Sequence, residues 1–468
     1  MEQTGLERVD DMKAYVQETS DDMTLDMIAE RRIGTIMTIT GLIRQAQEQE
    51  YMALAARETW VCVKAVSEHG EEQVYFYGIL TGMQMKKEAQ TSVMTIEIRT
   101  GSFLLDIEKH TRSFQDAGFT YESVAASCVT PAGGYSIMLE KEDEPTGCFL
   151  MQYDETDWAF IRRIASYAGV VLRPEYATGG KKIYLGYSGR SAAGNLEPDS
   201  YQVIRNYRAD SRTDAFGGDG YACETAYIVR TREIYELGDI VAFQGRRLVA
   251  GRIESRLEGQ ELCHTYHLIP ERDGLLPALY NSRLHGVALK AKVLSVETTV
   301  VQVQFDEDEN KEGCGRHWFD FATVYSTPDG AGWYCMPEVG DEVRVVFPDN
   351  CEEHAYVASS VHVGSAGGRT NPEEKFWRNR HKKEIRFTPD SLTLTNNNGL
   401  TVELSDAEGI KICSDKDIVL KADGEVRIKS QNAGVYMDAA DKMLFRQGAA
   451  KIRMEDAIWM EGGKIYMN

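Results

Sequence analysis

Three short stretches of the sequence carry residue types that could bind a metal ion or hydrolyse a bond. One contains Cys263, His264 and His267, a thiol and two imidazoles within five positions. In an extended strand the side chains alternate between faces, so positions 264 and 266 share one face while position 267 points to the other. The two imidazoles then cannot easily reach a single ion, and we expect no metal site here.

The other two stretches are acidic. Asp306–Glu309 could hold a cation, but this run follows a predicted strand, and we expect a solvated loop. Tyr153, Glu155 and Asp157 could form an acidic active site, yet an apolar stripe at helical spacing follows them, which predicts helix-start and capping residues. His317, next to a tryptophan, is expected at the surface or at an interface.

The sequence motifs of common enzyme classes are missing from the chain. It contains no nucleophile elbow (GxSxG), no zinc-protease helix (HExxH) and no phosphate-binding Walker motif. We therefore expect no enzyme activity, no catalytic residue, no cofactor and no metal. The alternative of a cell-wall hydrolase would require an embedded domain with paired carboxylates in a cleft, and the sequence leaves no room for one.

Charge and composition limit the classes of partner. The 468-residue chain has a formal net charge of −21, which argues against binding to a phosphate backbone, so nucleic acid is not an expected partner. Nine cysteines without a CxxC pair indicate folding in a reducing cytoplasm. The N-terminus shows no basic and then apolar leader, and no apolar run reaches the ~20 residues of a membrane span. We expect synthesis in the bacterial cytoplasm without a signal peptide.

Strand patterns dominate the chain before the first predicted linker. Apolar runs punctuated by turn residues fill 34–98, and a second β region covers about 170–270, with a hairpin that turns at Gln244-Gly245. Each region is typical of a small barrel or half-barrel. Residues 1–30 are polar and acidic, and we expect an irregular or helical lead-in there.

Two helices are expected between these β regions. Thr120 is a suitable N-cap residue for the first helix. The second is predicted from about Thr156 to Ala168, because an apolar stripe over these residues is followed by Gly169, where helices often stop.

Residues 284–363 contain five short strand patterns, which is the size of an OB-type barrel. The segments 276–283 and 364–383 are predicted linkers on either side of it. The second linker contains the basic run Arg378–Lys383, for which a solvated collar is the favoured interpretation and a docking patch for a partner is the alternative.

The last stretch, residues 384–468, repeats a short unit about every eight residues. Pairs of apolar residues two positions apart are separated by Asp, Gly, Ala, Ser and Asn, and this spacing is that of a strand. A strand this short cannot bury its apolar face alone, so the repeats must stack on copies of themselves. The paired residues are Ile410, Ile412, Ile418, Leu420, Val426, Ile428, Val435, Met437, Met443, Phe445, Ile452, Met454, Ile458 and Met460, followed by Ile465 and Met467.

An intertwined trimeric β-helix is the favoured architecture for these repeats, because three chains can fill one narrow axis and leave no sheet edge open. A single-chain β-solenoid and an ordinary antiparallel meander are the alternatives. The meander fits the early repeats but not eight in succession. In the trimer this region would be a stiff rod with a mechanical function, built around the paired residues as its core.

Four stretches resemble one family, the hub-and-spike proteins of contractile injection systems. The stretch from Ser102 through Asp116 resembles its L-x-x-x-x-x-x-R-x-F-Q segment, and the terminal repeats resemble its needle. A third stretch is similar to its Q-Y-x-E-T-D helix start and a fourth to its P-E-x-G-D-E-V segment. These two motifs place structural residues at Gln152, Tyr153, Glu155, Thr156, Asp157, Pro337, Glu338, Gly340 and Asp341. The family comprises the VgrG proteins of type VI secretion and the hub-plus-spike proteins of phage tails.

The resemblance implies a mainly β protein in three parts. Residues 1–275 would form the hub, with two barrel-like domains and a helical insert at about 117–170; three chains would make a six-fold-like ring that adapts the spike to the inner tube. Residues 284–363 would form an OB-fold neck and residues 384–468 the needle. The implied partners are two further copies of the chain, the inner tube protein and baseplate proteins, with transient contact to the target membrane.

The end of the needle implies one more partner. The last layer, Ile465, Tyr466, Met467 and Asn468, would be blunt and apolar, so we expect a small conical PAAR-type tip protein to cover it. Effectors as further cargo are left open. The resemblance places the protein at the baseplate end of a phage tail-like particle, which is delivered to or through the target envelope. A trimeric fibre or adhesin is the alternative that shares the needle but lacks the hub motifs.

Two devices of some relatives are missing from the sequence. Only about 20 residues separate the OB domain from the needle, too few for the lysozyme that some phage members insert there. No histidine follows His381, so the paired-histidine iron site at the apex of some phage needles is not expected.

Overall fold

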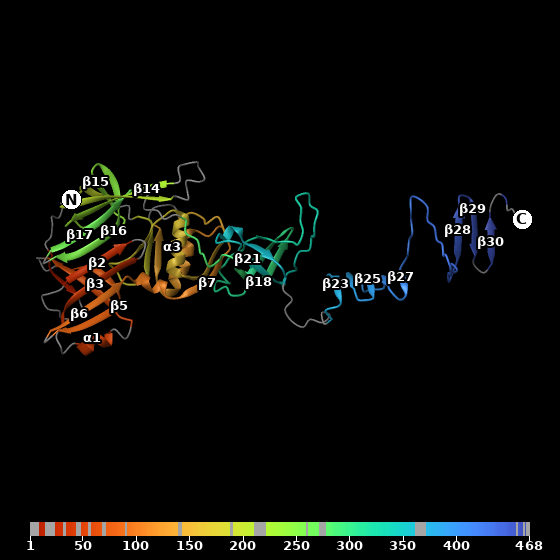
Figure 1. Cartoon of the computed structure of the whole chain (residues 1–468), viewed down its shortest axis with the longest axis horizontal. Coiled ribbons are helices and arrows are strands. Elements are labelled where there is room, and N and C mark those ends of the chain that lie inside the picture. The colour runs from red at the N-terminus through yellow and green to blue at the C-terminus, as the bar shows by residue number, and fades with distance from the viewer. Residues whose placement is uncertain are drawn as a thin grey trace. The chain divides into compact units, whose positions relative to one another are not determined.

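The computed structural model of the chain describes the larger part of the sequence and is mainly β (Figure 1). It divides into two compact units, Met1–Val363 and Gly364–Asn468, which are described separately. The described residues are 9–14, 24–30, 34–43, 48–54, 58–67, 72–88, 91–138, 143–187, 191–209, 221–258, 261–270, 278–360, 371–454, 457–461 and 464.

A twelve-stranded sheet forms the hub part of the first unit, with the strand order β1-β4-β5-β6-β3-β2-β16-β17-β14-β13. In addition, β15 pairs with β16, and β12 pairs with β15. Two strand groups lie on either side of β2. The first contains β1 (Val9–Ala14), β3 (Gly34–Ile43), β4 (Trp60–Ser67), β5 (Glu72–Glu88) and β6 (Thr91–Arg99), with the short helix α1 (Glu48–Leu54). The second contains β12 (Ser191–Asn195), β13 (Ser200–Ala209), β14 (Tyr221–Thr231), β15 (Ile240–Phe243), β16 (Arg246–Glu258) and β17 (Glu261–Ile269).

The strand β2 (Thr24–Glu30) joins the two groups into one sheet. It pairs antiparallel with β3 on one side, where Met27 lies opposite Met37, and with β16 on the other, where Met27 lies opposite Ser255. The prediction of an irregular or helical lead-in over residues 1–30 was therefore wrong for the described parts of that segment. Its polar sequence gave no strand signal, because this strand is held by backbone pairing on both edges with partners distant in the sequence.

The predicted hairpin at Gln244-Gly245 is confirmed between β15 and β16, and both turn residues have positive φ (50° and 72°), as a tight hairpin turn requires.

Each strand group has its own apolar core. The first core includes Met37, Val63, Phe76, Ile96 and Ile98, and the second includes Val229, Val241, Phe243, Tyr266 and Leu268.

Both predicted helices are present between the strand groups. Thr120 caps α2 (Tyr121–Val129) in a reciprocal capping box with Ser123, and Thr156 caps α3 (Asp157–Ala168), which ends at Gly169 with a left-handed φ of 63°. They pack with a 3-10 helix (Gly101–Asp106) and the strands β7 (Lys109–Phe114), β8 (Tyr135–Met138), β9 (Leu150–Thr156), β10 (Leu172–Pro174) and β11 (Lys182–Leu185).

The OB domain contains five strands in the order β20-β19-β18-β21-β22, as the sequence predicted. Its third strand along the chain, which the apolar pattern predicts over Phe319–Tyr325, is the two-residue strand Phe319–Asp320. A parallel bridge between Phe321 and Val357 connects the two ends of the sheet. The strands are β18 (Ala288–Glu297), β19 (Val300–Phe305), β20 (Phe319–Asp320), β21 (Glu342–Val346) and β22 (Tyr356–Ala358).

The second unit consists of two antiparallel meanders. The first contains β23 (Lys375–Arg378), β24 (Glu384–Phe387), β25 (Ser391–Thr395), β26 (Thr401–Ser405) and β27 (Gly409–Cys413), and the second β28 (Met443–Gln447), β29 (Ala450–Met454) and β30 (Ile458–Glu461) (Figure 1). Residues 414–442, all described, form no strand in the single chain. The first strand, β23, lies within the segment predicted as a linker, and the predicted tip residues 465–468 lie outside the described residues.

Candidate functional site

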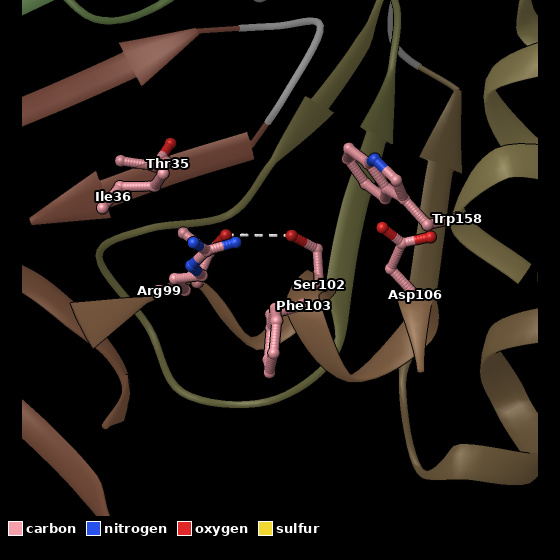
Figure 2. Close-up of a pocket in the computed structure, with 8 residues that line it drawn as sticks. Thr35, Ile36, Arg99, Ser102, Phe103, Asp106 and Trp158 are labelled. Carbon is pink, nitrogen blue, oxygen red and sulfur yellow. Dashed lines mark hydrogen bonds between the residues drawn. The ribbon is translucent and has the colours of Figure 1, made fainter. Parts of the chain in front are cut away.

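A small pocket in the hub lies where β3, the 3-10 helix and α3 meet (Figure 2). Its polar groups are largely engaged by one another or by neighbours. Ser102 and Thr100 hydroxyls are 2.9 Å apart, and Asp106 accepts a hydrogen bond of 2.6 Å from the Thr156 hydroxyl. Arg99 donates to Glu97 at 2.9 Å. The Ser102 hydroxyl is paired with the Thr100 hydroxyl and not with a histidine, lysine or carboxylate among the lining residues, so this pocket does not show the nucleophile–base pair of a hydrolase.

An extended polar arrangement lies at the junction between hub and OB domain. Its apolar centre comes from the hub strand β9 and the residue before it. Phe149 and Met151 are buried within the OB core, and the Phe149 ring lies 5.1 Å from Phe319 and 6.1 Å from Phe305. His317 stacks on Phe149 at 5.7 Å, so this histidine lies at an interface inside the chain. Hub and OB domain therefore share a core.

A buried guanidinium links the two parts above this core. Arg163 on α3 is only 1% exposed. It donates to Glu155 at 2.9 Å, to the Met151 carbonyl at 2.8 Å and to Glu352 of the OB domain. Burial alone would lower the pKa of Arg163, but the carboxylates of Glu352 and Glu155 raise it above its ordinary value. Burial raises the pKa of Glu155, which Arg163 offsets only in part.

A second polar contact across the junction corrects the interpretation of the acidic run 306–309. Asp308 is buried and accepts hydrogen bonds from the Ser113 backbone amide at 3.0 Å and from the Ser113 hydroxyl. Glu309 accepts from the Thr111 amide at 3.0 Å and lies 2.7 Å from His110 Nδ1. The solvated-loop prediction was therefore wrong for the buried Asp308, while Glu309 is exposed but bound to β7. The sequence does not reveal that backbone amides of β7 face this turn.

The acidic helix start also takes part in the junction. The predicted helix position is confirmed, but only Thr156 caps it, through the Ala159 amide at 3.2 Å. Asp157 is buried and accepts from Arg112 at 2.6 Å and from Gln152 at 3.0 Å. The prediction that the carboxylates are capping residues is therefore corrected. Glu155 neutralises the buried Arg163 and Asp157 the partly buried Arg112, a role that charge spacing alone could not reveal.

The remaining predicted motif forms a turn before β21. The Glu338 amide donates to the Asp341 carboxylate at 2.9 Å, and the Asp341 amide returns a bond of 3.0 Å to the Glu338 carbonyl. Gly340 adopts a φ of 97° and donates to Val293 on β18 at 2.9 Å. A glycine is favoured here because other residues rarely adopt this backbone conformation.

The cysteine–histidine stretch on β17 is part of the second barrel-like group. His264 is buried and lies 2.7 Å from the Ser255 hydroxyl, and burial lowers its pKa to about 4. Among the described residues, no group of three or more His, Cys, Asp or Glu side chains is placed to hold a metal ion. No described helix is long and apolar enough to cross a membrane.

The second unit displays an apolar face that its own chain covers only in part. Strand register places Ile385, Leu394, Val402 and Ile412 in one row across β24–β27, and Phe387, Leu392, Leu404 and Ile410 in a second row. We name these eight residues the apolar face. Ile410 is 73% exposed and Leu404 is 42% exposed. The paired residues predicted from the sequence begin at Ile410. The same two-residue spacing of apolar residues occurs before Ile410, in β24–β26, and could have identified these strands of the apolar face from the sequence.

The apolar pairs further along the chain are exposed as well. Ile418, Leu420, Val426, Ile428, Val435, Met437, Phe445, Ile452, Ile458 and Met460 all keep more than a third of their surface exposed in the single chain. Exposed apolar surface on this scale marks an interaction site in a folded protein. Scattered single residues would not have this meaning, but here the exposure follows a regular repeat.

The basic run before β24 is partly used inside the unit. Arg378 donates to Glu384 at 2.7 Å and Arg386 donates to the same carboxylate at 2.6 Å. Asn397 adds a third hydrogen bond at 3.0 Å. Arg378 is exposed, as are His381, Lys382 and Lys383, but its guanidinium is also paired with Glu384 inside the unit. Burial alone would raise the pKa of Glu384, but these donors outweigh it and lower the pKa to about 2.

This carboxylate predicts an acid-sensitive step in the second unit. A lowered pKa means that Glu384 stabilises the fold above its ordinary pKa of 4.5 and loses this effect as the pH falls toward about 2. The thermal midpoint of Glu384→Gln should therefore lie below that of the wild type at neutral pH, and the gap should close between pH 4.5 and 2. Circular dichroism melts across this range test it, with Glu403→Gln in the same sheet as control. A gap that stays constant with pH would contradict the role of this carboxylate.

Family comparison matches both parts of the first unit. Residues 34–216 match the family model of the phage tail baseplate hub (GPD), and residues 290–362 match the type VI secretion system/phage-baseplate injector OB domain. Together the two matches span more than half of the chain. No curated protein sequence gives a significant match.

Solved structures share the fold. The chain is similar to the Escherichia coli protein c3393, a type VI secretion component with structural similarity to the T4 tail proteins gp27 and gp5: identity is 15%, the TM-score is 0.53, and 75% of this chain and 100% of that chain are covered. It is also similar to a chain of the lidded Francisella PdpA–VgrG complex, with 8% identity, a TM-score of 0.52 and coverage of 84% and 76%. Hub and OB domains follow each other here in one chain, and the protein belongs to the VgrG-like hub-and-spike proteins of contractile injection systems.

Proposed function

We propose that three copies of this chain form the central spike of a contractile injection machine. The observation that carries the proposal is the apolar face, whose two continuous rows are partly exposed in the single chain, with Phe387, Leu394, Leu404, Ile410 and Ile412 the exposed members. Three copies around one axis would cover these rows and those of the later repeats, and the sheet edges would close on one another. The unpaired segment 414–442 would gain its strand partners from the other chains.

The hub would adapt the spike to the inner tube. Each chain has two barrel-like strand groups in one sheet, so three chains would present six such groups to a hexameric tube. The junction between hub and OB domain supports this role, because a shared core and buried ion pairs can transmit axial force. Baseplate proteins would surround the hub, and the needle would meet the target membrane first.

The free end of the needle would carry a small conical tip protein over residues 465–468. An exposed apolar end layer would otherwise be an aggregation site. We also propose that the chain is a structural protein without enzyme activity of its own, which acts at the baseplate end of a phage tail-like particle. A peptidoglycan-release assay would test the alternative of a cell-wall hydrolase.

The mass of the purified full chain in solution tests the proposal. Light scattering should give three times the 52.6 kDa of one chain. A particle with the mass of a single chain would contradict the shared needle and favour a single-chain solenoid. The apolar face makes a stable monomer the less favourable state, because its surface would stay in water.

A further inference from the structure

A hairpin of the OB domain stands outside the five-stranded sheet. We name residues 323–334 the arm. Its two sides are joined by hydrogen bonds from the Trp333 amide to the Tyr325 carbonyl at 2.9 Å and from the Thr327 amide to the Ala331 carbonyl at 2.9 Å. The Thr323 hydroxyl also donates to the Trp333 carbonyl at 2.7 Å. These hydrogen bonds make the arm an ordered hairpin.

Large apolar side chains of the arm point into solvent in the single chain. Val324 is 88% exposed and Tyr334 is 75% exposed, and about half of the surface of Tyr325 and Trp333 is exposed too. The only charged residue of the arm is Asp329, at its tip, while 27% of the whole chain is charged. Aromatic enrichment with few charges is typical of the centre of a protein interface.

The net charge of the chain limits which partner the arm can contact. Each copy of the chain carries a net charge of −21, so two copies repel each other wherever acidic surface meets acidic surface. A largely apolar segment with a single charge is where such copies can touch with little of this penalty. The arm is present in every copy, which matches a contact repeated around a symmetry axis.

The position of the arm in the chain supports the same partner. Its base is bound to the last strand of the OB domain: the Ala322 amide donates to the Val357 carbonyl at 2.7 Å, and Phe321 bridges Val357. Only ten residues, 361–370, follow before the first described residue of the second unit, and ten residues span at most ~36 Å. Chains that share one needle would thus hold their OB domains close together, at a high effective concentration.

We propose that the arm packs against the OB domain of a neighbouring copy and forms a second contact between chains, in addition to the needle. This inference rests on the proposed three-chain spike. Val324 and Tyr334 would be buried in this contact. The Tyr334 hydroxyl already donates to the Thr298 carbonyl at 2.8 Å, which fixes the ring for docking.

Site-specific photocrosslinking in the full chain tests the arm. A benzophenone amino acid in place of Val324 should give an adduct with twice the 52.6-kDa mass of one chain on a denaturing gel, and its yield should not fall on dilution. Peptide mapping should place the crosslink in the OB domain of the second chain. The same amino acid in place of Ile107, an exposed apolar residue of the hub, is the matched control.

The possible outcomes distinguish the proposed contact through the arm from the proposed contact through the needle. A trimer mass in solution without an interchain adduct from position 324 overturns the arm contact and leaves the three-chain spike in place. The same holds if position 324 crosslinks only to a tube or baseplate protein in assembled particles. A solution mass equal to that of one chain overturns both proposals.

Discussion

Replacement of Arg163 by methionine is expected to lower the free energy of unfolding of the first unit by about 3–5 kcal/mol. The methionine keeps most of the buried volume but leaves the carboxylates of Glu155 and Glu352 without their shared partner. An uncompensated buried charge is far more costly than the loss of an exposed ion pair. Urea unfolding followed by circular dichroism measures the change, and hydrogen exchange of the β9 amides locates it.

The neighbouring residue on α3 provides the control for this variant. Arg162→Met changes the same chemistry at a half-buried position, and its effect should stay within about 0.5 kcal/mol. Adding Glu155→Gln and Glu352→Gln to Arg163→Met should recover part of the loss, because neutral amides tolerate burial better than carboxylates. If Arg163→Met is as stable as Arg162→Met, the ion pair does not hold the junction.

Val426→Asp is expected to abolish assembly and to give a particle with the 52.6-kDa mass of one chain instead of three times that mass. Val426 lies in the exposed apolar repeat, and in the proposed needle three copies of it would meet near the axis. Three carboxylates in a narrow apolar core would each lack water and a partner, and they would repel one another. Light scattering at several protein concentrations measures the result.

Arg427→Asp is the matched control for the needle. The residue follows Val426 directly, so in a strand its side chain points to the opposite face. Its ion pair with Glu425 is exposed on both sides, so its loss should have little effect. This control changes the net charge by more than Val426→Asp does. A trimer that survives Val426→Asp, or that is lost equally in both variants, would contradict the proposed axis.

The sequence predicted those helices and strands whose patterns lie in neighbouring residues of the chain. The helix α3 was predictable because an apolar stripe, a threonine cap and a terminal glycine agree. The OB strands were predictable because Val301, Val303 and Phe305 alternate with polar residues. The exposed repeats were visible for the same reason, since their spacing is a property of the chain and not of its partners.

The junction was not predictable, because its signals are not local. Asp308 and Ser113 are 195 positions apart, and Arg163 and Glu352 are 189 apart. An acidic residue after a strand is usually solvated, and only the three-dimensional contact changes its role. β2 was missed in the same way, since its partners on β16 decide that it is a strand.

The pairing of β2 with β16 also sets an order of events during synthesis. Glu30 and Arg252 are partners in the sheet but are 222 positions apart in the chain. At ~5–20 residues per second, a ribosome needs roughly 10–45 s to make the intervening chain. During this time β2 can pair with β3 as a hairpin, but its other edge stays open to foreign strands. The nascent hub is therefore expected to need a chaperone until β16 is made, and the two strand groups to join into one sheet only then.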